Sequence, residues 1–165
     1  MPMTLDQFNT APPEELTELL EACAPIPSWR SALLARRPYA DLQELTQTAA
    51  EIARDWTDLE VDAALAHHPR IGEKVQGATR EAQASRREQG SLSEDEAAQQ
   101  EWFSANQDYE DRFDRIFLVR AAGRTPEQMM TQLRLRLQNT PEEEADIRRE
   151  QLSEIAVLRL EHSVA

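Results

Sequence analysis

A histidine that continues an apolar helix face is the first residue of this sequence placed for proton-transfer chemistry. His68 stands just before Pro69, where a predicted helix ends. Its side of that helix is otherwise apolar, with Val61, Ala64 and Leu65 at helical spacing. Partial burial disfavours the charged imidazolium, so the imidazole stays neutral and able to exchange a proton near neutral pH. The alternative is that His68 only satisfies a hydrogen bond at a helix end.

Three polar side chains at helical spacing form a second candidate cluster. Ser85, Glu88 and Gln89 are spaced i, i+3 and i+4, so they share one face of a predicted helix. Together they offer a hydroxyl, a carboxylate and an amide, which can hydrogen bond to a small polar heterocycle at several points. The neighbouring Arg86 and Arg87 also agree with the alternative, a solvated helix face.

An arginine within the apolar stripe of the last predicted helix is the third candidate. Arg159 follows Leu152 and Ile155 at helical spacing, which places its guanidinium among core residues. A buried cation needs an anion or a group of carbonyl oxygens, and a substrate carboxylate can be bound by both guanidinium nitrogens. The alternative is an internal salt bridge, and Arg148 lies on a similar side of the same helix. We expect Arg159 at a carbonyl or at the edge of a pocket.

Several other chemistries find no support in the sequence. His67, His68 and Glu73 lack the HExxH spacing of a zinc site, so no metal is expected. The GxGxxG, Walker and GxSxG motifs are absent, and no cofactor is expected. Cys23 has no histidine near it in the sequence, so we expect a buried structural thiol.

The composition limits the partners that the chain can have. Among 165 residues, 31 Asp and Glu against 18 Lys and Arg give a net charge of −13, which repels nucleic acid and anionic membranes. No apolar run reaches the roughly 18 residues that span a bilayer. Residues 1–10 do not resemble a secretory signal, the last four residues are not a peroxisomal address, and the lone cysteine suits a reducing compartment. We therefore expect a cytoplasmic protein.

Periodicity predicts an all-α fold, a single compact domain of about seven to nine helices with one short extended segment. Proline starts, acidic first turns, caps and apolar stripes mark the helices. Ser28 is predicted to cap a short helix, Asp41 opens the next, and Thr57 with Glu60 forms a capping box. The apolar run at 116–120 is predicted to be extended, because it is short and rich in β-branched residues. The helix after Thr57 is predicted to run from residue 59 to about residue 67. A long helix capped by Ser91 or Ser93 is predicted to end near residue 113, and the other predicted helices lie in residues 13–24, 79–89, 126–137 and 141–158.

Two motifs at a characteristic separation resemble the family of 2-oxo-4-hydroxy-4-carboxy-5-ureidoimidazoline (OHCU) decarboxylases. These are HPRIGEK at residues 68–74 and SRREQ at residues 85–89. The resemblance covers nearly the whole chain, residues 1–165, in the expected order. It continues through Phe8-Asn9, Asn106, Tyr109-Glu110, Arg112-Phe113, residues 116–124 and residues 158–160.

The resemblance implies an all-helical, cofactor-free enzyme of urate breakdown, usually a homodimer, that converts OHCU to (S)-allantoin and carbon dioxide. It assigns catalysis to His68 and Glu88, and it makes His67 a bystander. The substrate-binding positions that it implies are Pro69, Ser85, Gln89, Phe117, Leu118, Val119, Arg120, Ala121 and Arg159. One position departs from the family pattern: Asp114 stands where a glycine is common, and a glycine that needed positive φ would change the following turn.

The chemistry implied by this resemblance requires no metal. Loss of carbon dioxide leaves an electron pair that can delocalise into the adjacent unsaturated ring, if fixed donors meet the developing charge. Main-chain N–H groups of residues 117–121 and the amide of Gln89 are the expected donors, and His68 protonates one face of the carbanion. Two alternatives remain: a non-catalytic helical protein-interaction module, and a decarboxylase of a related ureido acid.

Overall fold

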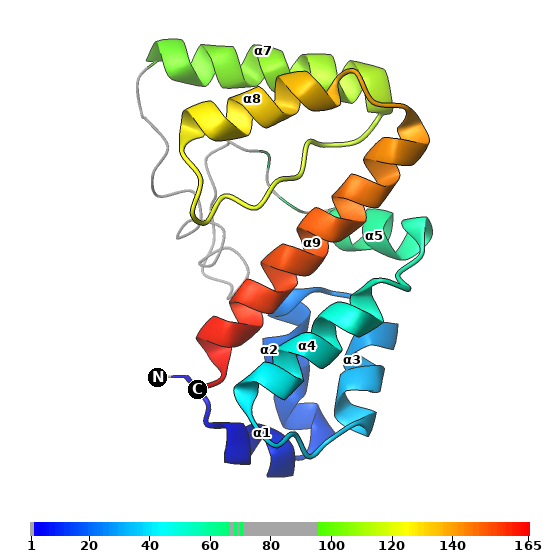
Figure 1. The fold of residues 1–165 in the computed structure, drawn as a ribbon, viewed down its shortest axis with the longest axis vertical. Helices are drawn as coiled ribbons and strands as arrows, with labels where there is room; N and C mark the ends of the chain where they lie inside the picture. Colours follow the sequence, from blue (N-terminus) through cyan, green and yellow to red (C-terminus); the bar gives the residue numbers. More distant parts are fainter. Residues whose placement is uncertain (1, 67, 69, 71–95) are drawn as a thin grey trace. The chain divides into compact units, whose positions relative to one another are not determined.

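The computed structural model of the chain describes residues 2–66, 68, 70 and 96–165, and this part is all-α (Figure 1). It contains eight helices and no strand, which confirms the predicted fold class and number of helices. One isolated bridge joins Met3 and Val164. The helices are α1 (Leu5–Thr10), α2 (Pro13–Cys23), α3 (Pro27–Ala35), α4 (Leu42–Ala53), α5 (Asp58–Leu65), α7 (Glu96–Phe113), α8 (Pro126–Arg136) and α9 (Pro141–Ser163).

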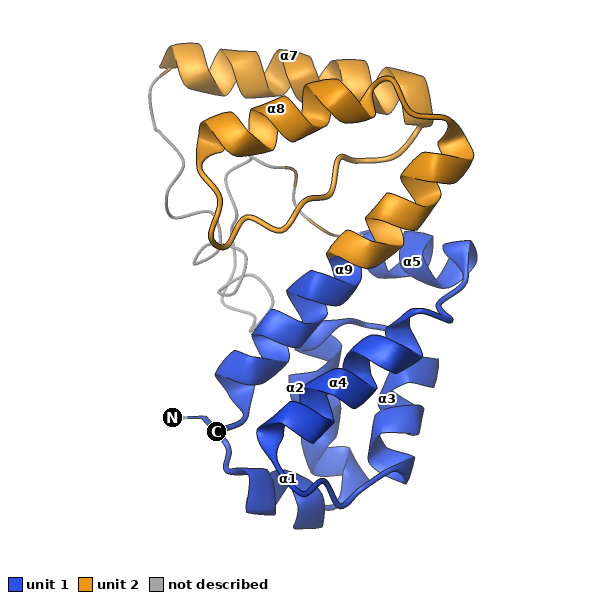
Figure 2. Ribbon diagram, in the orientation of Figure 1, with its two compact units in different colours: residues 1–67, 152–165 blue, residues 68–151 orange. Residues whose placement is uncertain are grey.

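Contacts divide the chain into two compact units (Figure 2). Unit 1 consists of residues 1–67 and 152–165, and unit 2 consists of residues 68–151. The long helix α9 begins in unit 2 and ends in unit 1. The predicted helix at 79–89 lies outside the described residues. The extent of the domain, residues 1–165, stays a prediction.

Side-chain caps set the beginnings of several helices, as their sequence pattern predicts. Asp41 accepts a hydrogen bond from the Glu44 N–H at 2.7 Å at the start of α4. Thr57 and Glu60 form the predicted capping box of α5, with hydrogen bonds of 3.1 and 3.0 Å. Helix α5 ends at Leu65, two residues before the predicted end.

The expected role of Ser28 as a helix cap is wrong. Helix α3 begins one residue earlier, at Pro27, because proline suits the first turn of a helix and Ile26 takes the N-cap position. The Ser28 hydroxyl instead donates a hydrogen bond to the Glu60 carboxylate. This bond, followed by the Thr57 N–H, lowers the pKa of Glu60. Ser28 therefore joins α3 to the start of α5.

Helix α1 was not predicted, because its six residues carry too few apolar side chains to show a helical stripe. A capping box formed by Thr4 and Gln7 starts it, and Phe8 is its one buried residue. Arg37 binds its C-terminal end by donating to the carbonyls of Phe8 and Ala11 at 3.0 and 2.7 Å. Long-range contacts that a local pattern does not contain therefore stabilise this short helix.

The core of unit 1 is built on the apolar faces of α2, α3 and α4. Trp29 is fully buried, its indole N–H donates to the Ala49 carbonyl at 3.1 Å, and its ring meets Trp56 edge-on at 6.0 Å. Cys23 is a buried thiol that forms no disulfide, as predicted. The chain ends lie together, since the Met3 N–H donates to the Ser163 carbonyl at 2.9 Å.

Tyr39 is a buried phenol in this core, with 4% of its surface exposed. Its hydroxyl donates to the Leu33 carbonyl at 2.6 Å, and its main-chain N–H and C=O both bond to the Asn9 side chain. Burial raises the pKa of Tyr39 to about 12, because a phenolate would lose its hydration. The neutral form is therefore favoured in the folded state.

We predict that this phenol makes stability fall at high pH. The stabilisation is fully present below the unfolded pKa of about 10, and it is lost as the pH rises towards the folded pKa. Between about pH 9 and about pH 11.5, the wild type should lose about 2 kcal/mol more unfolding free energy than Tyr39→Phe. Urea unfolding across this range measures the difference, and parallel curves for the two proteins would contradict it.

Candidate active site

The residues that sequence reasoning assigned to the site fall into three groups in the structure. His68 and residues 117–121 belong to unit 2, and Arg159 belongs to unit 1. The remaining four residues lie outside the described part of the chain, namely Pro69, Ser85, Glu88 and Gln89. The described residues therefore provide the histidine, the extended segment and the late arginine, and the assignment of the other four stays a prediction.

His68 lies beyond the end of α5, and its side chain is partly buried. The residue as a whole is of intermediate exposure, while its Nε2 atom is inaccessible to solvent. This matches the half-buried environment that the apolar face of the preceding helix predicts.

An ion pair attaches the chain next to His68 to helix α7. Arg70 donates from Nε and Nη2 to the two carboxylate oxygens of Glu110, at 2.8 and 2.7 Å. This bidentate geometry restricts both the distance and the orientation of the guanidinium. Because only one residue separates Arg70 from His68, the pair restrains the main chain that carries the histidine.

Residues 117–121 run without helical structure between α7 and α8 (Figure 1), as predicted. Phe117, Leu118 and Val119 are buried, with at most 2% of each exposed. The Phe117 ring meets Tyr109 of α7 edge-on at 5.2 Å between centroids. The segment is therefore part of the core of unit 2. The other large apolar residues of this core are Trp102, Phe113, Met129, Met130 and Leu133.

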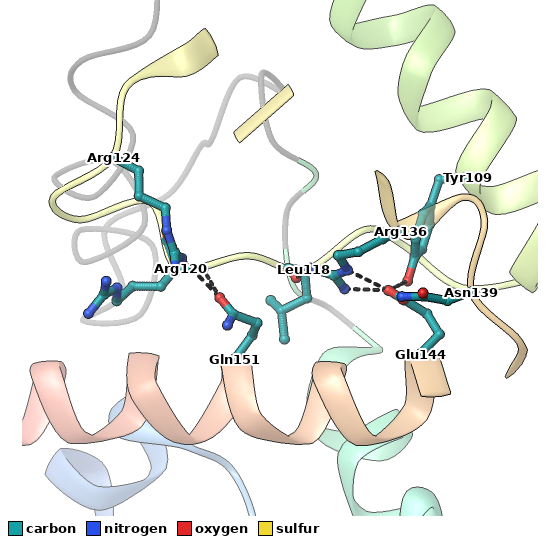
Figure 3. A network of polar contacts seen from close by, with 8 residues as sticks. All are labelled: Tyr109, Leu118, Arg120, Arg124, Arg136, Asn139, Glu144 and Gln151. Atoms are coloured by element: carbon teal, nitrogen blue, oxygen red, sulfur yellow. Dashed lines mark hydrogen bonds and ion pairs between the residues drawn. The ribbon is translucent and has the colours of Figure 1, made fainter. Parts of the chain in front are cut away.

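A buried polar cluster lies against this segment, and we call it the Arg136 network (Figure 3). The guanidinium of Arg136 donates from Nε to Glu144 at 2.7 Å and from Nη1 to the Leu118 carbonyl at 2.7 Å. Glu144 also accepts hydrogen bonds from the Tyr109 hydroxyl and from Asn139. Both charged residues are buried, with exposed fractions of 5% for Arg136 and 1% for Glu144.

The aromatic rings complete the surroundings of the buried cation. Arg136 lies 4.5 Å from the centroid of the Phe117 ring and 5.9 Å from that of Tyr109. Burial, and then the hydrogen bond to Glu144, raise the pKa of Tyr109, so its hydroxyl remains a donor. The network therefore joins α7, α8 and α9 to the main chain of the extended segment.

Gln151 of α9 makes a second attachment to the segment. Its Oε1 accepts from the Arg120 N–H at 2.9 Å and from Nη1 of Arg124 at 3.0 Å. The same Arg124 nitrogen donates to the Arg120 carbonyl at 2.8 Å. Figure 3 shows these residues beside the Arg136 network. The Arg120 N–H is thus already engaged and is not an available donor in this conformation.

Sequence reasoning missed Arg136 and Gln151, although a signal for each exists. Arg136 follows Met129 and Leu133 at helical spacing, which is the pattern that singled out Arg159. Gln151 lies on the buried side of α9 beside Leu152. The pattern marks such positions as buried, but it does not identify the distant carbonyl or N–H that each side chain meets.

Arg159 is buried in unit 1, with 4% of its surface exposed. Its Nη1 donates to the main-chain carbonyl of Ala22 at 3.1 Å. This agrees with the expectation of a carbonyl partner for Arg159. A contact between Arg159 and substrate stays a prediction.

Asp114 shows how the chain turns from α7 into the extended segment. It has φ of 56°, the left-handed conformation that glycine adopts most easily and that aspartate tolerates better than most residues. Its N–H donates to the Glu110 carbonyl at 2.8 Å and so ends the helix. The positive φ associated with a glycine at this position is therefore retained with an aspartate.

The described residues contain neither a metal-binding cluster nor a membrane-spanning helix. No group of three or more His, Cys, Asp or Glu side chains in this part of the chain could hold a metal ion. None of the described helices is long and apolar enough to cross a bilayer.

Comparisons with known proteins agree with one another. A family model described as OHCU decarboxylase matches residues 9–161. The uric acid degradation bifunctional protein of Bacillus sp. (strain TB-90) is 28% identical over 162 residues, which are 96% of this chain and 32% of that protein. The chain thus spans about a third of the length of this curated relative.

Two solved structures have a similar fold. A crystal structure of OHCU decarboxylase in the presence of (S)-allantoin matches with a TM-score of 0.72 and 23% identity, over 88% of this chain and 96% of that one. A crystal structure of (S)-allantoin synthase matches with a TM-score of 0.73 and 20% identity, over 99% of this chain and 54% of that one. These likenesses show a shared fold.

The turn at Asp114 gives a prediction about stability. Asp114→Ala should lose about 1–2 kcal/mol of unfolding free energy, because alanine is strained at positive φ. The unfolding free energy of Asp114→Gly should equal that of the wild type to within about 1 kcal/mol, because glycine adopts positive φ without strain. Urea unfolding measures both, with Asp108→Ala on the exposed side of α7 as the control. An Asp114→Ala variant as stable as Asp114→Gly would contradict the prediction.

Proposed function

Because the chain belongs to the OHCU decarboxylase family, we propose that it converts OHCU to (S)-allantoin and carbon dioxide in urate breakdown. The family match over residues 9–161 is the observation that carries this proposal. The shared fold with an OHCU decarboxylase crystallised in the presence of (S)-allantoin supports it. Membership in this family favours a decarboxylase over a non-catalytic interaction module.

The reaction breaks one carbon–carbon bond and forms one carbon–hydrogen bond. The bond to the carboxylate breaks, carbon dioxide leaves, and the electron pair remains on the ring carbon and its unsaturated neighbours. His68, neutral at the start, takes up the proton of the hydroxyl on that carbon, which becomes a carbonyl, and delivers a proton to one face of the adjacent ureido-bearing carbon, which gives a single enantiomer. The intermediate exposure of His68 supports this role, because a histidine that is neither fully buried nor fully exposed can reach a bound molecule.

The other proposed residues bind and orient the substrate. Glu88 orients the substrate and supports the working state of His68, while Ser85, Gln89 and Pro69 line the ring-binding side. Main-chain N–H groups within residues 117–121, other than the Arg120 N–H that donates to Gln151, stabilise the developing negative charge. We place Arg159 at the edge of the pocket, because a cation against the departing carboxylate would also stabilise the ground state.

The assembly and location of the protein are also part of this proposal. We propose a homodimer in the cytoplasm that uses neither a metal nor an organic cofactor. Sedimentation of the purified chain tests the dimer. The activity in a chelated, dialysed preparation tests the independence from metal and cofactor.

His68→Asn should remove catalysis while leaving the fold unchanged. Asparagine keeps a polar side chain of similar size but cannot transfer the proton, so kcat should fall by about 10²–10⁴-fold. OHCU is generated in place by urate oxidase and hydroxyisourate hydrolase, and circular dichroism follows the formation of (S)-allantoin. His162→Asn, at an exposed position of α9, is the control. A His68→Asn enzyme with wild-type turnover would refute the assignment.

The ion pair beside His68 gives a second functional prediction. Arg70→Glu and Glu110→Arg should each reduce kcat by about tenfold or more, because like charges would displace the chain that carries the histidine. The double variant restores an opposite-charge pair between the same two positions and should recover most of the lost rate.

The same assay measures all three variants, and far-ultraviolet circular dichroism checks their fold. A double variant no more active than its single parents would show that the pair does not position His68. In that case, a direct effect of the Arg70 charge on the anionic substrate would explain the loss.

A further inference from the structure

One edge of the extended segment Phe117–Ala121 is held by buried side chains. The Leu118 carbonyl accepts from Arg136 of α8, and the Arg120 N–H donates to Gln151 of α9. In an extended chain, main-chain groups two residues apart point to the same side. Both attachments therefore act on one edge, which we call the anchored edge. The residues of these attachments are drawn in Figure 3.

The attachment at Leu118 is rigid. Arg136 is buried, and Glu144 and the Phe117 ring both restrict its guanidinium. Glu144 is in turn bound by the Tyr109 hydroxyl and by Asn139. Movement of the Leu118 carbonyl away from Arg136 would leave part of a buried charge without its hydrogen bond, which is costly.

The opposite edge carries the main-chain groups of Val119 and Ala121. Both residues are buried, with exposed fractions of 2% and 6%. Within the described part of the chain, neither N–H donates a hydrogen bond to another residue; the Leu118 N–H has no such acceptor either, but it shares its edge with the Arg136 guanidinium. Buried N–H groups nearly always have an acceptor. Two such donors on one edge therefore indicate a place for a ligand that supplies acceptors.

We propose that Arg136 and Gln151 are positioning residues that turn the N–H groups of Val119 and Ala121, and not those of Leu118 and Arg120, towards the substrate. This inference rests on the proposed function, which supplies a substrate that develops negative charge. Donors fixed before the reaction stabilise such charge best, because they do not reorganise as it forms. The buried side chains of Arg136 and Gln151 thus determine which edge of the segment faces the substrate.

Gln151 gives the first test, because its side chain can be altered without removing a buried charge. Gln151→Leu has no acceptor for the Arg120 N–H, so the segment should shift, and kcat should fall by about 10–100-fold with a smaller change in KM. Gln151→Glu keeps an acceptor oxygen beside Arg124 and should remain within about threefold of the wild type.

Gln107→Leu is the matched control, since Gln107 lies on the exposed side of α7 and bonds only locally to Asp111. Thermal unfolding of each variant shows whether it is folded at the assay temperature. A folded Gln151→Leu enzyme with the wild-type kcat would overturn the proposal. An equal loss in Gln151→Leu and Gln151→Glu would also overturn it, because the acceptor oxygen would then be irrelevant.

Single backbone esters give a second test, which applies even if Gln151→Leu does not fold. Replacing Val119 by its α-hydroxy analogue exchanges the N–H for an oxygen and removes one donor from the free edge. The rate should fall by about 10²-fold, as for the loss of an oxyanion donor. The same exchange at Leu118, whose N–H lies on the anchored edge, should reduce the rate much less than the exchange at Val119. A loss at Leu118 equal to that at Val119 would refute the assigned edge.

The wild-type enzyme separates this inference from the proposed function. If the wild type does not accelerate the formation of (S)-allantoin from OHCU, the proposed function is wrong and the inference fails with it. If the wild type is active and the Val119 ester retains full activity, only the assignment of the edge is wrong.

Discussion

The buried charge of Arg136 is the constraint on which the arrangement of unit 2 depends. An arginine with 5% of its surface exposed is tolerated only where an anion and further acceptors surround its guanidinium. Glu144 supplies the anion, the Leu118 carbonyl supplies an acceptor, and the Phe117 ring supplies an electron-rich face. Glu144 belongs to α9, and Leu118 and Phe117 belong to the extended segment. The need to neutralise the Arg136 charge therefore fixes the positions of both α9 and the extended segment relative to Arg136.

For the proposed function, this means that residues which do not contact the substrate position the groups that do. The extended segment has no neighbouring strand in the described part of the chain, so side chains perform the attachment that a sheet would otherwise provide. Arg70 and Glu110 do the same for the chain beside His68. Helix α7 contributes to both attachments, through Tyr109 and Glu110.

Local rules predicted the helices well where the signal lay within a few residues. The caps at Asp41 and Thr57 and the proline starts of α2, α8 and α9 are found where the sequence indicates. The rules failed where a side chain or a helix end forms hydrogen bonds with residues that are distant in the sequence. Ser28 had the composition of a cap, yet its hydroxyl bonds to Glu60, 32 residues away. Helix α1 is short and nearly without an apolar stripe, and Arg37 binds its end.

The sequence by itself determined the all-α class, the positions of most helices, the extended run and the family, because periodicity, caps and motifs are properties of neighbouring residues. It also marked Arg159 as buried and His68 as half-buried. Only the tertiary structure decided the partners of these and other buried groups: Ala22 for Arg159, Leu118 and Glu144 for Arg136, and Arg120 for Gln151. The apolar stripe of a helix predicts that a polar side chain within it is buried. It does not predict the hydrogen-bond partner, because that partner lies on a distant segment that only folding brings into contact.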